Sequence, residues 1–142
     1  MNKMSPLLVL VSILVINTSV SAETDSRIAL NLPTQMEEHL LGNMRQHLVV
    51  INRLLDLVGQ EKLTEAAELA EAELGMSSLD KHGASHIAQF YPVQSANFGT
   101  EMHKAASRFA RVAEEGDPLE SYRAIGAITQ NCVGCHATAK VR

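Results

Sequence analysis

Apolar residues recur at helical intervals along most of the chain after residue 22. Between residues 34 and 59 they are separated by 3, 4, 3, 4 and 3 positions, the spacing that places side chains on one face of an α-helix. This face comprises Leu41, Met44, Leu48, Ile51, Leu55 and Val58. We predict a helix with this face turned inward, starting at Thr34, which has the spacing of a capping box with Glu37, and ending at Gly59.

Two further helices follow from the same periodicity. One is rich in Ala and Glu, spans about residues 61–74 and ends near Gly75; the other spans about residues 94–115 and ends at Gly116. The predicted inward positions are Leu63, Ala67, Ala70 and Leu74 in the former, and Phe98, Met102, Ala105, Phe109 and Val112 in the latter.

A fourth helix has the clearest start in the chain. Asp117 is a favourable N-cap, Pro118 suits the first helical position, and Glu120 follows three residues after the cap. Its predicted inward residues are Ile125, Ile128, Cys132, Cys135 and Ala139. Four amphipathic helices with short joints at Gly59 and Gly116, and little β signal, predict an all-α fold, an antiparallel four-helix bundle.

Residues 75–93 form a connection of 19 residues between the second and third helices. Connections of this length are uncommon unless they have structure or function of their own. This one contains His82, His86 and an aromatic turn at residues 90–92. We predict a partly helical crossover whose aromatic residues fill the core; the alternative is a segment that covers one edge of a bound cofactor.

The first 22 residues have the features of a cleavable signal peptide. Lys3 precedes an almost continuous apolar run at residues 6–16, and the small residues Val20-Ser21-Ala22 follow. No cysteine follows the run at which a lipid could be attached. The predicted mature protein, residues 23–142, is therefore a single soluble periplasmic domain with no stable membrane anchor.

The predicted mature chain carries 11 basic and 16 acidic residues, a formal charge of −5. This balance argues against a nucleic-acid partner and favours a basic protein partner.

The segment Cys132-Val133-Gly134-Cys135-His136 carries the strongest chemical signal. In a helix, Cys132, Cys135 and His136 project from one face, because they stand at positions i, i+3 and i+4. Two thiols at this spacing can add across the vinyl groups of a haem, and the adjacent imidazole can bind the iron. The motif therefore predicts one covalently bound haem c, attached through the chain's two cysteines.

Two other chemistries use the same residue types. A thiol–disulfide pair of the thioredoxin kind would require a βαβ pattern, which the sequence lacks. A zinc site would require a ligand beyond the two cysteines and His136. His39, His47, His82, His86 and His103 could supply it, but none stands at a recognisable spacing.

The chain resembles the class II c-type cytochromes, the cytochrome c′ family, in three respects: an export signal, four helices, and a CxxCH motif in the last helix. Gly59 followed by Ala66-Ala67 is a weaker similarity to the second helix of that family. The resemblance implies a haem iron bound by His136, and it makes a homodimer through the first two helices plausible. Ala139 and Lys140 occupy positions where the family commonly has an aromatic and a basic residue, so the aromatic part of the proximal pocket is missing.

In this family the residue opposite His136 comes from the first helix, and it is a methionine in low-spin members. The corresponding position here falls at or next to Met44, which the helical pattern also places on the inward face. The alternatives are His47, which would give a bis-histidine haem, and an open or blocked site. Met36, His39 and Met102 are weaker candidates, and Phe98, Phe109 and Tyr122 are candidates for the haem walls.

Methionine–histidine ligation raises the reduction potential and leaves no open position on the iron. The predicted function is therefore single-electron transfer to and from redox partner proteins, without enzymatic activity or catalytic residues. The alternatives are a five-coordinate haem protein that binds nitric oxide or carbon monoxide, as cytochrome c′ members do, and a thiol–disulfide protein without haem.

Overall fold

The computed structural model describes residues 24–141, and over this range the chain is mostly helical. The longer helices are α1 (Thr34–Gly59), α2 (Leu63–Leu74), α4 (Phe98–Glu114) and α5 (Pro118–Thr138). Between α2 and α4 lie the short helices η1 (Met76–Ser78), α3 (Ala84–Ile87) and η2 (Ala88–Phe90); two-residue strands β1 (Ile28–Ala29) and β2 (Ala139–Lys140) lie near the ends. The prediction of an all-α chain is confirmed. The predicted signal peptide lies outside the described residues.

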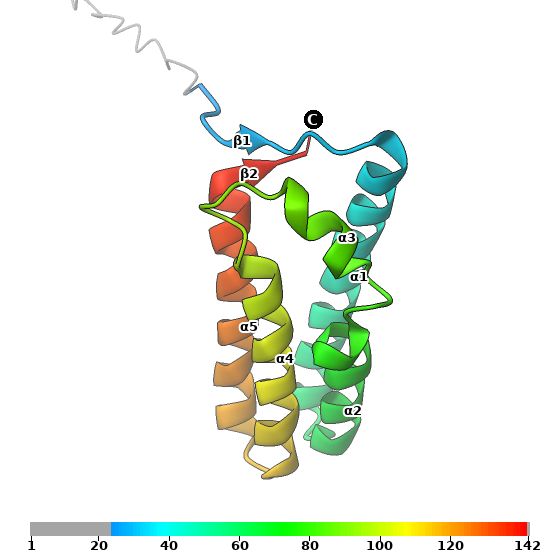
Figure 1. The fold of residues 1–142 in the computed structure, drawn as a ribbon. Helices are drawn as coiled ribbons and strands as arrows, with labels where there is room; N and C mark the ends of the chain where they lie inside the picture. The colour runs from blue at the N-terminus through cyan, green and yellow to red at the C-terminus, as the bar shows by residue number, and fades with distance from the viewer. Residues whose placement is uncertain (1–23, 142) are drawn as a thin grey trace, which may run out of the picture.

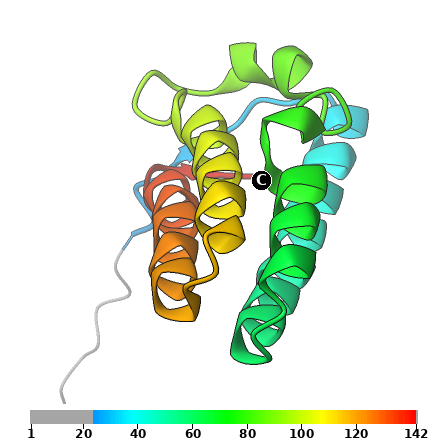
Figure 2. The ribbon, with the colours of Figure 1, turned by 90° about the horizontal axis from the view of Figure 1, so that it is seen from below.

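The four longer helices lie side by side (Figure 1). Helix α4 packs against both α5 and α2, and α1 packs against α2, whereas the side between α1 and α5 is the most loosely packed of the four. Figure 2 shows the α1–α2 pair next to the α4–α5 pair. A cleft opens on the α1–α5 side.

Local sequence sets the helix boundaries. Asp117 caps α5, since its Oδ1 accepts hydrogen bonds from the backbone N–H groups of Leu119 (2.8 Å) and Glu120 (3.1 Å). Gly59 is the last residue of α1, as predicted. The predicted capping box at Thr34 is wrong: Pro33 is the N-cap, no side chain caps this end, and the backbone N–H of Glu37 donates to the Pro33 carbonyl instead.

The predicted inward face of α1 is also wrong in part. Leu48 is 72% exposed and Leu55 is 42% exposed, while Met44 is half-buried. The buried residues of this helix are Leu40, His47, Val50, Leu54, Leu57 and Val58. The helix therefore carries two neighbouring apolar stripes; one enters the core, and most of the predicted face borders the open α1–α5 side.

The main core joins all four longer helices. Leu54, Leu74, Phe109 and Ile128, one from each helix, are fully buried in it. The inward positions predicted for α2 are all buried, as are Met102, Ala105 and Phe109 of α4. This core fixes the positions of α1 and α5 on either side of the cleft.

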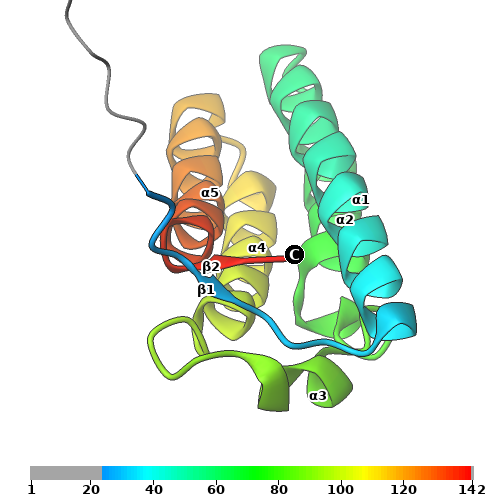
Figure 3. The same cartoon turned by 90° about the horizontal axis from the view of Figure 1, so that it is seen from above.

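A second, smaller core closes the end of the molecule where the two strands lie. Strands β1 and β2 pair in parallel, with Ile28 opposite Ala139, and the chain between α2 and α4 crosses the same end (Figure 3). This core contains Leu30, Leu40, Ile87 and Ala139. The prediction of a partly helical connection is confirmed.

No helix between residues 24 and 141 is long and apolar enough to cross a membrane.

Candidate functional site

A cleft runs between α1 and α5 in two adjoining parts. The part of about 310 Å³ lies beside Cys132, and the part of about 440 Å³ lies beside Lys140. Four residues line both parts: Met44, Tyr91, Cys135 and His136. The structure thus brings all four residues of the predicted site, Cys132, Cys135, His136 and Met44, to one cleft.

Helix α5 presents the motif to this cleft. Cys132 and Cys135 are free and half-buried, whereas His136, near the end of the helix, is exposed. Burial raises the pKa of both thiols, and the neighbouring Cys132 raises that of Cys135 further. Both are therefore neutral thiols at neutral pH. Reactive disulfide-exchange pairs instead have lowered thiol pKa values, so the environment is unlike theirs.

Helix α1 supplies the opposite wall. Met44 is half-buried, and Leu48 and Ile51 line the cleft within the next two turns. Leu48 is 72% exposed, although it borders a cleft whose other lining is largely apolar. The exposed side chain of Leu48 therefore adds to the apolar surface on the open side of the cleft.

The other predicted iron ligands are placed differently. His47 is buried and lines the cleft beside Met44, but its ring also contacts two other histidines. Met36 packs in the smaller core and is not among the residues that line either part of the cleft. His39 is exposed, with its Nε2 3.1 Å from the carbonyl oxygen of His82.

The walls of the cleft differ from those predicted. Phe98 does line the cleft near Cys132, but Phe109 is fully buried in the main core and Tyr122 is 60% exposed elsewhere on α5. Tyr91, which sequence analysis placed only within the aromatic turn of the connection, lines both parts of the cleft. Burial, followed by the neighbouring Cys135, raises the pKa of Tyr91 to about 12, so its hydroxyl stays protonated.

Two basic residues lie at the Lys140 end of the cleft. Arg27 and Lys140 both line it and both pair with Asp25, at 2.9 Å and 3.2 Å. Arg27 also donates from Nη1 to the backbone carbonyl of His136. The β1–β2 pairing brings residues this far apart in sequence together, so the helical pattern gave no indication of them.

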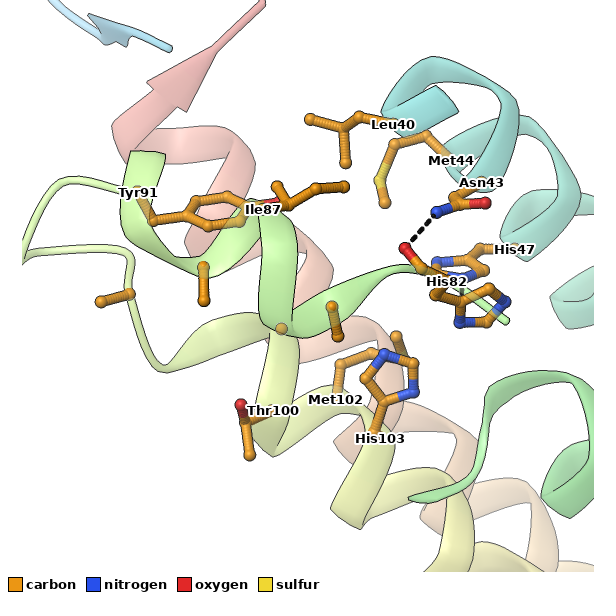
Figure 4. A pocket seen from close by; sticks show the side chains of 14 residues that line it. Leu40, Asn43, Met44, His47, His82, Ile87, Tyr91, Thr100, Met102 and His103 are labelled. Atoms are coloured by element: carbon orange, nitrogen blue, oxygen red, sulfur yellow. Dashed lines mark hydrogen bonds between the residues drawn. The ribbon is translucent and has the colours of Figure 1, made fainter. Parts of the chain in front are cut away.

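A cluster of three buried histidines, His47, His82 and His103, lies next to the cleft (Figure 4). Their ring centroids are 4.6 Å, 5.3 Å and 6.1 Å apart. The sequence identified His82 and His103 only as two of several possible zinc ligands, and it predicted no contact between them and His47. The three residues come from α1, the connection and α4, and no spacing in the sequence links them.

Two histidines of the cluster, His47 and His82, are uncharged at neutral pH. Burial lowers the pKa of His47 to about 4, and burial followed by the nearby His103 also lowers the pKa of His82. Within residues 24–141, no group of three or more His, Cys, Asp and Glu side chains is arranged to hold a metal ion.

Comparison with known protein families, curated proteins and solved structures finds no match to this chain.

Proposed function

We propose that the chain is a periplasmic c-type cytochrome of the class II kind, which carries single electrons through one covalently attached haem. The observation that supports this proposal best is that Cys132, Cys135, His136 and Met44 all line one cleft. The helices that form the two walls belong, in this proposal, to an antiparallel four-helix bundle.

The residues of α5 fit the attachment of a haem. Each thiol would add across one vinyl group, forming a C–S bond and transferring its hydrogen to the other vinyl carbon, and no oxidant is required. Both cysteines are free and half-buried at the edge of the cleft, where a porphyrin edge can reach them. His136 would supply the proximal nitrogen.

Met44 would supply a thioether on the opposite side. The haem would provide a one-electron Fe(III)/Fe(II) couple, and methionine–histidine ligation favours a high reduction potential. If His136 and Met44 both held the iron, the chain would need no acid, base or nucleophile of its own for one-electron transfer. We therefore propose electron transfer to and from protein partners, and no enzymatic reaction.

The walls would keep water from the iron. Leu48, Ile51 and Phe98 present apolar surface to the cleft around the cysteines. Covering the exposed side chain of Leu48 with an apolar macrocycle would stabilise the complex by about 25 cal/mol per Å² of apolar surface removed from water.

Mass spectrometry of the denatured protein and an absorption spectrum of the purified protein together test the function. We expect a mass increase of one haem that survives denaturation, together with the sharp bands of a low-spin haem. Broad high-spin bands would instead indicate the five-coordinate protein that binds nitric oxide or carbon monoxide. The absence of haem bands would contradict both and leave the thiol–disulfide protein.

Met44→Ala tests the sixth ligand. Removal of the thioether should convert a low-spin spectrum to a high-spin one, without loss of the attached haem. Met36→Ala is a matched control, because this methionine also lies on α1 but is not among the residues that line the cleft. A low-spin spectrum that persists in Met44→Ala would exclude this ligand and direct attention to His47.

A further inference from the structure

A small cavity of about 90 Å³ lies between α1, the 75–97 connection and α4. Three imidazoles and two thioethers line it: those of His47, His82, His103, Met44 and Met102 (Figure 4). No carboxylate, lysine or arginine is among its lining residues. The cavity thus gathers nitrogen and sulfur donors and has room for an ion.

Two ring nitrogens face each other in this cluster without a short hydrogen bond. Nε2 of His47 lies 3.4 Å from Nδ1 of His82, which in turn lies 3.4 Å from Oγ of Ser78. Hydrogen bonds to nitrogen and oxygen are usually about 2.7–3.2 Å long. Two nitrogens bound to one metal ion at about 2.0–2.1 Å, with an angle of about 110–120° between the bonds, are roughly 3.3–3.6 Å apart, a range that includes the observed separation.

The surrounding contacts hold the His82 backbone and the His103 ring. The carbonyl oxygen of His82 accepts a hydrogen bond from Nδ2 of Asn43 at 3.0 Å. His103 Nδ1 lies 2.7 Å from the carbonyl oxygen of Leu74, to which it donates. Ser78 donates its hydroxyl proton to the Gly75 carbonyl at 2.7 Å. The Ser78 hydroxyl therefore does not donate to His82 Nδ1 and faces it, at 3.4 Å, only as an acceptor.

The neutral donors and the absence of a carboxylate determine which ion the cavity can bind. Burial keeps His47 and His82 neutral at neutral pH, so their ring nitrogens can offer lone pairs without first losing an added proton. A divalent ion in a cavity without a carboxylate would be poorly compensated. Thioethers favour soft ions, and imidazole binds copper well, so a monovalent copper ion fits the donors and their lack of charge.

We propose that Nε2 of His47, Nδ1 of His82 and the thioether of Met102 bind one Cu(I) ion in this cavity. The histidines alone do not form a metal-binding group; the thioether completes the site. Met102 is 6% exposed and lines this cavity and the Cys132 part of the cleft, whereas Met44 lines the cavity and both parts of the cleft. This inference goes beyond electron transfer and does not require haem.

Anaerobic titration with Cu(I), held by excess bicinchoninate as a competing chelator, tests the site. The cysteine thiols also bind Cu(I), so they must be occupied: either by the attached haem or, in haem-free protein, by alkylation. We expect one equivalent of Cu(I) to be withdrawn from the chelator in either form. Zn(II) offered with its own competing chelator should not be retained.

His82→Gln and Met102→Leu should each weaken Cu(I) binding by about 10-fold or more, as is typical for changes around a metal site. His86→Gln is the matched control, because His86 lies in the same connection but is exposed. Far-UV circular dichroism verifies that each variant is folded, and Met102→Leu keeps a buried apolar side chain if His82→Gln does not fold. No uptake of Cu(I), unchanged binding in folded variants, or tight retention of Zn(II) would overturn the proposal. The alkylated, haem-free protein tests the copper site whichever side chain binds the iron, so failure of this proposal can be distinguished from failure of the proposed function.

Discussion

His47 carries an ionisable ring that the fold holds in its neutral form. Burial is the main cause of its lowered pKa of about 4, and the neighbouring His82 and His103 lower it further. In the unfolded chain the pKa of a histidine is about 6.5, so the unfolded state binds the proton first as pH falls. The contribution of neutral His47 to the free energy of unfolding is therefore fully present above about pH 6.5. It is lost as the pH falls towards 4.

We predict that this residue makes the metal-free protein less stable at pH 4 than at pH 7 by about 3 kcal/mol, since each pKa unit corresponds to about 1.4 kcal/mol. Urea denaturation of the natural protein and of His47→Leu at both pH values measures the effect. The carboxylates that also titrate in this range are common to both proteins. The loss of stability in acid should be smaller in the variant, whereas exposed His86→Leu should behave like the natural protein. An equal loss in His47→Leu and the natural protein would contradict the assignment.

The sequence could predict the position of some residues of the site but not of others. Cys132, Cys135 and His136 could be placed together because they lie within one turn of one helix. Met44 was placed opposite them by family resemblance and helical pattern. His82 could not be placed, because it lies in a connection without periodicity, 35 positions from the His47 side chain that it contacts.

At the scale of a helix, two glycines of α5 have opposite surroundings. A Cβ added at exposed Gly126 would meet nothing within 4 Å. A Cβ at Gly134, between the two cysteines, would lie 2.5 Å from Cε1 and 2.7 Å from Cζ of Phe98. The absence of a side chain at Gly134 therefore lets Phe98 approach α5 beside the motif.

We predict that Gly126→Ala raises the free energy of unfolding by up to about 1 kcal/mol, the difference in helix propensity. Gly134→Ala gains the same propensity but forces the Phe98 ring to move, at a cost of about 1–3 kcal/mol. It should therefore be the less stable of the two variants in chemical denaturation. Adding Phe98→Leu to Gly134→Ala should recover part of the difference; no recovery would show that the ring is not the obstacle.

The helices themselves could largely be predicted from the sequence, but the orientation of α1 could not. Its apolar positions form two neighbouring stripes, and the regular spacing through Leu41, Leu48 and Leu55 described the more exposed one. The buried stripe contains His47, whose polar ring interrupts the pattern. Only packing against α2 and the rest of the core decides which stripe is buried, and this information is not local to the helix.

At the scale of the whole molecule, the first and last described segments meet beside the cleft. Strands β1 and β2 are two residues each, too short to give an alternating pattern, so the sequence could not predict them. The backbone N–H of Leu30 donates to the carbonyl of Lys140 at 2.9 Å. The β1 segment thus contacts and stabilises the end of α5, next to His136.

Substitutions at Leu30 and at Ile28 distinguish the contribution of the buried strand contacts to stability from that of an exposed strand residue. Leu30 is 4% exposed in the smaller core, whereas Ile28 is 43% exposed. Leu30→Ala should therefore lower the free energy of unfolding by about 2–4 kcal/mol through the cavity it leaves. Ile28→Ala should cost under about 1 kcal/mol, because little of its apolar surface is buried on folding.

Hydrogen exchange followed by mass spectrometry provides the structural readout. Leu30→Ala should lose protection at both strands and in the last turn of α5, while the main core of α4 stays protected. Uniform loss of protection would instead mean that the two cores unfold together.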